Sequence, residues 1–422
     1  MLIEFSVKNF LSFKNKVTLS MEKGNGDENL DNIVSNNNLD LLKTCAIYGA
    51  NASGKSNILK ALTCAILIVR NSSLIPVGGK WNFIHPFLFD EVSKNMPSEF
   101  EFIFVINNIK YRYFFSIDAN RIYDEVLEAY YSQKPTNIFK RTKTNIYEFS
   151  NDKNKLESLS TNNTENKLFL STATTWNYDK TKDVYLWFAN AIDTYDSFDN
   201  IMDKDLIDYS NSEENLKEFA LKLLKEADIL IKDIIVNYEE KEMDSTIIDM
   251  LVPSIVKNGE KVKIKNVNIE LEHEVVDDNN KTHTYKLNFT EESSGTRVLF
   301  AFAPFLKRAF ESTKVIVVDE LEKSMHPVLV EFIVKLFNNK EINKANSQLI
   351  FTTHATNLLN LDLLRRDQIW FTEKNPKNGV SDLYPLDSFS VRKDENIQKG
   401  YINGRYGAIP FIRDVDLWLE NN

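Results

Sequence analysis

The chain has 422 residues, of which 43% are hydrophobic and 27% are charged, so it can bury a substantial core in about two to three domains. Its net charge of −10 argues against a broadly basic surface. No apolar run approaches the roughly 20 residues of a membrane-spanning helix, and Met1–Phe5 lacks the pattern of a signal peptide. We therefore expect a soluble, cytoplasmic protein without a membrane partner, in which Cys45 and Cys64 are reduced core thiols.

The N-terminal stretch predicts strands followed by a phosphate-binding loop. Residues 1–20 alternate in polarity as strands do, and residues 22–40, rich in Gly, Asn and Asp, predict a surface loop. Residues 44–48 are apolar and β-prone, residues 49–56 (GANASGKS) fit the pattern Gly-x-x-x-x-Gly-Lys-Ser/Thr, and residues 57–62 have helical spacing. A glycine-rich loop between a strand and a helix can surround phosphate oxygens with backbone N–H groups, although similar turns exist that bind nothing.

The positions of this loop predict a site for a nucleoside triphosphate and Mg²⁺. Lys55 would reach the β and γ phosphates, and the Ser56 hydroxyl would ligate the metal ion. The residues expected to hold the nucleotide here are Gly49, Asn51, Ala52, Ser53, Gly54, Lys55, Ser56 and Asn57.

A β-rich stretch follows the loop and its helix. Residues 100–106 and 111–117 are joined by two asparagines and predict a hairpin with aromatic residues suited to a half-buried sheet. Residues 121–131 and 145–149 continue this antiparallel pattern.

The centre of the chain is predicted to be mainly helical. Residues 150–165 are polar and predict a loop, and helical periodicity dominates residues 166–240, most clearly in 216–231. Residues 247–289 mix strand-like runs with charged turns.

The C-terminal part alternates between helical and strand-like periodicity. Helices are expected at 295–311 and 327–338, and strands at 314–318, 348–351 and 368–371. Strands that alternate with helices predict a parallel sheet.

Four clusters in this part could complete a nucleotide site, and the fourth is residues 321–327, directly after the two carboxylates of the first. Asp319 and Glu320 follow a buried strand, where a carboxylate can hold Mg²⁺ and its neighbour can accept a proton, although an acidic turn is also common there. His354 follows another strand and could equally be a core or loop residue. The run 291–297 (EESSGTR) precedes a helix and would also serve as an ordinary N-cap.

The order of these motifs resembles the ABC-type ATPase family, and more narrowly its RecF, SMC and OLD-type branch. The N-terminal run 8–13 (KNFLSF), the phosphate-binding loop, Ser-Ser-Gly before a helix, Asp-Glu, His326-Pro327 and Thr-Thr-His all stand in this order. The resemblance covers residues 1–131 and 285–422. The segment 400–410 resembles the end of compact, stand-alone AAA-type ATP-binding proteins that are encoded beside effectors in phage-defence operons.

The resemblance implies a role for each active-site residue. Lys55 and Ser56 belong to the triphosphate and Mg²⁺ site, and Asp319 is the Walker B carboxylate that shares the metal ion with Ser56. Glu320 is the general base, and His354 is the switch histidine that contacts the γ-phosphate.

The resemblance also implies that two heads pack head to tail around two ATP molecules. Ser293, Ser294 and Gly295 match the signature motif, which reaches the γ-phosphate held by the opposite protomer. Ser294 stands where the usual motif has glycine. Ser324 and His326 match the loop that crosses the interface between the heads.

Two further positions differ from the longer relatives. No glutamine stands at the expected place of the Mg²⁺-linked loop, which His85 or Pro86 roughly occupies, so this ligand is left unassigned. Asp414 and Asp416 have the spacing of a Toprim metal site but lie too close to the C-terminus for such a domain to follow, so we give them no role.

The expected fold is an α/β P-loop NTPase with an ABC-type ATPase head, whose mixed sheet carries an antiparallel β subdomain, and with an inserted, mainly helical region. The first lobe would span residues 1–150, the inserted region 151–284 and the second lobe 285–422.

The leading functional hypothesis is an ATPase that forms an ATP-sandwiched homodimer, or a higher oligomer, and regulates a separate effector such as a nuclease in anti-phage defence. The alternative is a RecF-like, ATP-dependent DNA-binding repair module, which the net charge does not support. A transporter head is disfavoured by the N-terminal and His-Pro motifs, and a GTPase by the lack of a base-recognition motif.

Overall fold

The structure, a computed structural model, is described over seven segments of the chain. These are residues 1–36, 39–195, 206, 208–209, 214–243, 262–392 and 395–410. Asp414 and Asp416 lie outside them. The chain divides into two compact units. Unit 1 comprises Met1–Asp196, Ala309–Glu322 and Ile333–Asn422, and unit 2 comprises Ser197–Arg308 and Lys323–Phe332.

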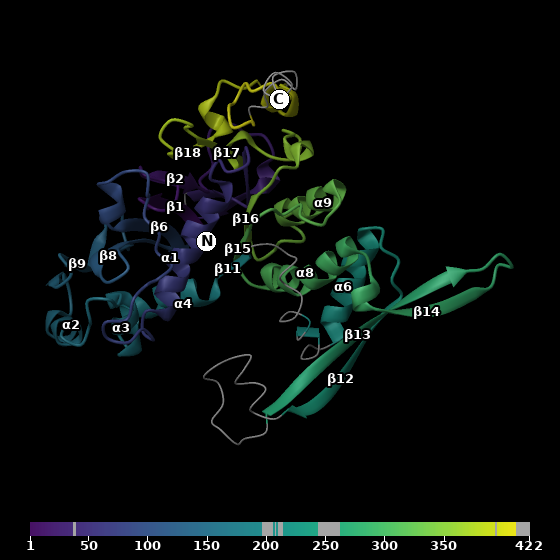
Figure 1. Cartoon of the computed structure of the whole chain (residues 1–422), viewed down its shortest axis with the longest axis horizontal. Coiled ribbons are helices and arrows are strands. Elements are labelled where there is room, and N and C mark those ends of the chain that lie inside the picture. The colour runs from purple at the N-terminus through teal and green to yellow at the C-terminus, as the bar shows by residue number, and fades with distance from the viewer. Residues whose placement is uncertain are drawn as a thin grey trace, which may run out of the picture. The chain divides into compact units, whose positions relative to one another are not determined.

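An antiparallel sheet of seven strands forms one part of unit 1 (Figure 1). In spatial order its strands are β10 (Ile146–Glu148), β9 (Thr136–Thr142), β8 (Ile122–Tyr130), β7 (Ile109–Ile117), β6 (Ser98–Ile106), β1 (Leu2–Lys8) and β2 (Val17–Ser20). The predicted hairpin is confirmed as β6 and β7, and Asn107 and Asn108 connect them with φ angles of 48° and 64°. Asparagine tolerates this left-handed conformation better than most residues, which suits it to a tight hairpin turn.

A second, mostly parallel sheet of six strands forms the other part of unit 1. In spatial order its strands are β11 (Ile192–Tyr195), β15 (Val315–Val318), β16 (Gln348–Thr352), β5 (Thr44–Gly49), β17 (Ile369–Lys374) and β18 (Ser381–Pro385). Only β18 runs antiparallel to its neighbour. β15 and β5 are buried along their whole length, as expected for strands with both faces covered.

Helix α1 (Lys55–Asn71) belongs to the same hydrophobic core as both sheets of unit 1. Its buried residues, among them Ile58, Leu62 and Ile66, lie on most sides of the helix rather than along one stripe. α4 (Asp179–Asn190) packs beside α1 and covers the antiparallel sheet, where the rings of Trp187 and Phe104 stack at 4.1 Å. Burial of each such large apolar side chain contributes about 1.5–3 kcal/mol to stability.

The remaining elements are shorter or belong to unit 2. The other helices are α2 (Lys153–Ser160), α3 (Phe169–Thr175), α6 (Glu214–Glu226), α8 (Ser294–Glu311), α9 (Pro327–Asn338) and α10 (Ile397–Ile402). Short 3₁₀ turns are η1 (Leu30–Asn32), η2 (Ser93–Asn95), η4 (Phe289–Glu291), η5 (Thr356–Leu358), η6 (Arg366–Gln368) and η7 (Leu386–Ser388). Two further sheets consist of β3 (Ile33–Asn36) with β4 (Leu39–Leu42), and of β12 (Asp233–Met243), β13 (Val262–Val276) and β14 (Thr282–Asn288). The last three strands form the long antiparallel sheet of Figure 1.

The predicted α/β fold with an antiparallel β subdomain is confirmed, but several local predictions were wrong. The loop expected at 22–40 contains β3 and the start of β4, and the loop expected at 150–165 contains α2. Part of the expected helical stretch 166–240 is strand, namely β11 and most of β12. β12 begins with the run Asp233-Ile-Ile-Val, whose β-branched residues favour strands. The predicted division into three segments stays a prediction.

Candidate active site

The carboxyl ends of three parallel strands bring the expected catalytic residues of unit 1 to one edge of its central sheet. β16 pairs in parallel with β15 and β5, and β5 pairs in parallel with β17. Asp319 and Glu320 follow β15, His354 lies two residues beyond β16, and the phosphate-binding loop begins at the end of β5. Ligands of open α/β sheets bind in the crevice outside such strand ends.

The phosphate-binding loop turns sharply between β5 and α1. Ala52 has a φ of 60° and Gly54 a φ of 121°, conformations that carry the chain into the first helical turn at Lys55. A Cβ on Gly54 would lie 2.8 Å from Oγ of Ser381, so this position needs glycine for space as well as for its backbone conformation.

Lys55, near the end of the phosphate-binding loop, is buried. Its ammonium donates hydrogen bonds to the carbonyl oxygens of Gly49 at 2.8 Å and Ala50 at 3.1 Å. Burial lowers the pKa of Lys55, and the negative charge of Asp319 is the largest of the effects that oppose this. The charges of Lys55 and Asp319 therefore influence each other.

Hydrogen bonds from distant segments hold the outer side of the loop. Oγ of Ser53 shares a hydrogen bond of 2.6 Å with Oγ1 of Thr372 on β17, and Oγ of Ser381 on β18 donates to the Ser53 carbonyl at 2.6 Å. Nδ2 of Asn57 donates to Oγ of Ser12 at 2.8 Å. Ser12 belongs to the KNFLSF run, so the N-terminal motif contacts the first turn of α1, directly after the phosphate-binding loop.

Thr352 orients the carboxylate pair. Its hydroxyl donates to Oδ1 of Asp319 at 2.5 Å and accepts the backbone N–H of Glu320 at 2.8 Å. Glu320 has a φ of 52°, a left-handed conformation that non-glycine residues rarely adopt outside functional sites and turns. The side chain at the end of β16 therefore sets the geometry at the end of β15.

Glu322 is a third carboxylate at this edge, for which no sequence motif predicted a role. Its Oε1 accepts the backbone N–H of His354 at 2.6 Å, and its Oε2 is buried without a hydrogen-bond partner among the described residues. Burial and then the charge of Lys55 lower the pKa of His354, and Glu322 is the largest influence in the opposite direction. Its place two residues after Asp319-Glu320 was the only signal in the sequence.

The signature segment of unit 2 caps a helix. Oγ of Ser293 accepts the backbone N–H of Thr296 at 3.1 Å, and α8 begins at the next residue, Ser294. A Cβ on Gly295 would lie 3.5 Å from the carbonyl oxygen of Ser324, so the signature turn and the loop leading to His326 are neighbours within this unit. This geometry fits an ordinary N-cap. It also fits a signature motif that contacts phosphate, because an N-cap leaves the other N–H groups of the first turn available.

The expected site residues differ in exposure. Buried residues are Gly49, Ser53, Gly54 and Lys55; half-buried residues are Ser56, Asn57, Gly295, Asp319 and Glu320; exposed residues are Asn51, Ala52, Ser293, Ser294 and His354. Those of unit 1 meet at the edge of the central sheet, and those of unit 2 lie at the start of α8.

The side-chain oxygens of Ser56 and Asp319 suit a Mg²⁺ ion that is also bound by phosphate. Ser56 offers a hydroxyl and Asp319 a carboxylate, the hard oxygen ligands that Mg²⁺ takes when substrate phosphates and water complete its octahedron. Within the part of the chain that the structure describes, no group of three or more His, Cys, Asp or Glu residues could hold a metal ion by protein ligands alone.

The chain matches a family model and is similar to solved structures. A family model described as "AAA domain, putative AbiEii toxin, Type IV TA system" matches residues 45–360. The chain is similar in structure to the SMC head domain from Thermotoga maritima, with 14% sequence identity and a TM-score of 0.40 over 91% of this chain and 98% of that one. It is also similar to the Smc head domain with an extended coiled coil bound to the C-terminal domain of ScpA derived from Pyrococcus furiosus, with 15% identity and a TM-score of 0.37 over 91% and 96% of the two chains. No curated protein matches.

None of the helices in the described residues is both long and apolar enough to cross a membrane.

Proposed function

The chain belongs to the AAA-domain family described as putative AbiEii toxin, Type IV TA system, and on this premise we propose that it binds ATP with Mg²⁺ and hydrolyses it at the carboxyl edge of the central sheet. The observation that carries the proposal is the meeting of Lys55, Asp319, Glu320 and His354 at this edge. A buried lysine, a carboxylate pair and a histidine around a phosphate-binding loop are the parts that phosphoryl transfer to water requires.

Binding begins with an exchange of partners at Lys55. Its ammonium bonds the Gly49 and Ala50 carbonyls, and the β and γ phosphates of ATP would replace these oxygens as acceptors. The loop N–H groups and the start of α1 add partial positive charge. Ser56 and Asp319 would hold Mg²⁺, which neutralises the charge of the phosphates when bound.

Hydrolysis requires a water molecule to attack the γ-phosphorus in line with the bond to the β-γ bridging oxygen. The carboxylate of Glu320 would accept one proton from this water as the new P–O bond forms and the bond to ADP breaks. Thr352 keeps Glu320 and Asp319 in fixed relative positions through its two hydrogen bonds. The imidazole of His354, whose pKa is lowered by partial desolvation and then by the charge of Lys55, would contact a γ-phosphate oxygen.

A second copy of the chain would complete this site. Ser293 and Ser294 are exposed at the start of α8, where helix N–H groups favour a phosphate. In the ABC-type arrangement they reach the γ-phosphate of the opposite protomer, so ATP would hold two heads together. We further propose that this pairing controls a separately encoded effector, such as a nuclease, in anti-phage defence. The family description names a putative AbiEii toxin of a Type IV TA system, which supports a role in such a system.

Loss of Lys55 tests nucleotide binding most simply. Lys55→Ala removes the cation that contacts two phosphates, and we expect the rise in melting temperature that ATP and Mg²⁺ give the wild type to disappear. Lys60→Ala, on the exposed side of the same helix, is the matched control and should keep the full shift. An unchanged shift in Lys55→Ala would overturn the proposed site. If DNA rather than ATP raised the melting temperature, a DNA-binding role would replace the one proposed.

A further inference from the structure

The C-terminal segment, defined here as residues 395–408, is folded tightly on itself. The hydroxyl of Tyr401, in α10, donates a hydrogen bond to the carbonyl oxygen of Ala408 at 3.0 Å. The hydroxyl of Tyr406 donates to Oε1 of Glu395 at 2.6 Å. These two hydrogen bonds connect the beginning, the middle and the end of the segment.

Aromatic rings fix this segment on the central sheet of unit 1. The rings of Tyr401 and Tyr406 are buried, and each stacks on Phe371 of β17, at 5.5 Å and 5.9 Å between centroids. The ring of Tyr401 also meets Tyr48 of β5 edge-on at 5.9 Å. Such pairs contribute to stability beyond the apolar area that they bury. The segment is thus packed against the strand that leads directly into the phosphate-binding loop.

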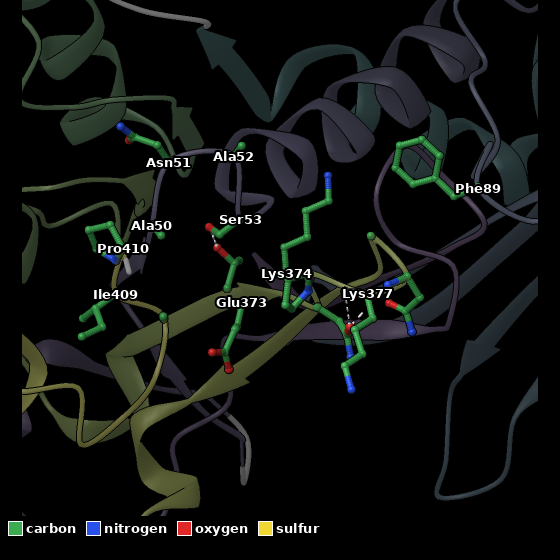
Figure 2. A pocket seen from close by; sticks show the side chains of 16 residues that line it. Ala50, Asn51, Ala52, Ser53, Phe89, Glu373, Lys374, Lys377, Ile409 and Pro410 are labelled. Carbon is green, nitrogen blue, oxygen red and sulfur yellow. Dashed lines mark hydrogen bonds between the residues drawn. The ribbon is translucent and has the colours of Figure 1, made fainter. Parts of the chain in front are cut away.

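The end of the segment borders that loop. Residues 408–410 and residues 50–53 of the loop line the same cavity, which has a volume of about 850 Å³. Figure 2 shows Ile409 and Pro410 on the side of the cavity where Ala50 of the loop lies. The C-terminal segment is therefore a direct neighbour of the proposed ATPase site.

The segment also contacts the chain directly after His354. Nε2 of Gln398, in α10, donates a hydrogen bond to Oγ1 of Thr356 at 3.2 Å. The hydroxyl of Tyr48 donates to the carbonyl oxygen of Ala355 at 3.2 Å. One of these donors belongs to the segment and the other to the strand on which it packs, so together they hold the two residues that follow the histidine.

The position of the His354 side chain depends on this backbone. The histidine is exposed, so the backbone that carries the imidazole mainly determines where the imidazole lies. Glu322 accepts the N–H of His354 itself, and the hydrogen bonds to Ala355 and Thr356 hold the chain on the other side. A catalytic side chain has to be held to within a fraction of an ångström by such supporting contacts.

We propose that the C-terminal segment positions His354 for hydrolysis, through the hydrogen bond between Gln398 and Thr356. The proposal rests on the proposed function, because it takes His354 to contact the γ-phosphate. Gln398 is a positioning residue, since it touches neither the nucleotide nor the reacting atoms. A role in the rate of the reaction is thereby assigned to a segment for which the sequence motifs implied none.

Steady-state hydrolysis, measured together with ATP binding, tests this role. Gln398→Ala removes the donor, and we expect kcat to fall about fivefold, the size expected when one neutral hydrogen bond supports only the transition state. KM, and the Kd of MgATP from calorimetric titration, should stay unchanged, because the phosphate-binding loop is intact. Thr356→Val removes the acceptor at similar size and should give the same loss, whereas Thr356→Ser keeps the hydroxyl and should retain the wild-type rate.

The double variant of Gln398→Ala with Thr356→Val makes the test specific for this hydrogen bond. Because either substitution alone breaks the bond, kcat of the double variant should also fall about fivefold, rather than the roughly 25-fold of two independent losses. Lys399→Ala is the matched control, since Lys399 is exposed on the same helix, and it should keep the wild-type kcat.

Three results would overturn the positioning role and leave the ATPase site standing. They are a wild-type kcat in Gln398→Ala, a multiplied loss in the double variant, and a rise in the Kd of MgATP as large as the fall in kcat. If the wild type bound MgATP but did not hydrolyse it, or did not bind it, the proposed function itself would fail, and the positioning role with it.

Discussion

The two halves of the proposed ATPase site are built in different ways. In unit 1, hydrogen bonds from β17, β18 and the N-terminal run hold the phosphate-binding loop, and Thr352 and Glu322 hold the ends of neighbouring strands. In unit 2, the signature turn is held by a local cap between Ser293 and Thr296, and its two serines are exposed. The first region is preorganised by contacts from distant parts of the chain. The second is a surface whose partner, in our account, is a second copy.

The substitution with the largest expected effect tests whether Ser293 belongs to a signature motif or only to an ordinary N-cap. Aspartate caps helices as well as serine does, so Ser293→Asp should keep the wild-type melting temperature. Its added negative charge would face the γ-phosphate of the opposite copy, and we expect ATP hydrolysis to fall about 100-fold, as when one donor to a reacting oxyanion is lost. Steady-state phosphate release and thermal melting measure the two properties on the same sample.

Ser293→Ala is the companion variant, since it removes the cap and should lower stability by about 1 kcal/mol. A Ser293→Asp protein that hydrolyses ATP at the wild-type rate would show that the turn caps α8 and does nothing more.

A smaller effect is expected from substitution of Glu322, the third carboxylate at the edge of the central sheet. Glu322 accepts a hydrogen bond from the backbone N–H of His354 and does not contact the nucleotide in our account, so it is a positioning residue. Glu322→Ala would free the histidine segment and should lower kcat about tenfold with little change in KM, as expected when only the transition state is affected. Glu322→Gln keeps a carbonyl oxygen that can accept the same N–H and should recover most of the rate. Equal losses in both variants would instead assign the carboxylate charge a direct role.

Local patterns in the sequence were enough to predict the core of unit 1. The phosphate-binding loop, the apolar strand before Asp319 and the hairpin around Asn107 and Asn108 each depend on residues close together in the chain. The recognition of an ABC-type ATPase from the order of these motifs is confirmed by the family match over residues 45–360.

The contacts that shape the site could not be predicted in the same way. Ser381 and Thr372 hold the loop at Ser53 across more than 300 positions of sequence, and no periodicity connects such residues. β18 itself is a short strand that, among the described strands, pairs with β17 alone.

ATP-dependent pairing of two heads is the central claim, and Glu320→Gln tests it most directly. The substitution removes the proton acceptor but leaves the phosphate-binding loop intact, so ATP should remain bound and hold the heads together. Light scattering after size exclusion, with ATP and Mg²⁺, should give twice the chain mass of 48.9 kDa, and with ADP the mass of one chain. A Glu320→Gln protein that binds ATP, as seen by its melting temperature, yet elutes at 48.9 kDa would contradict the account.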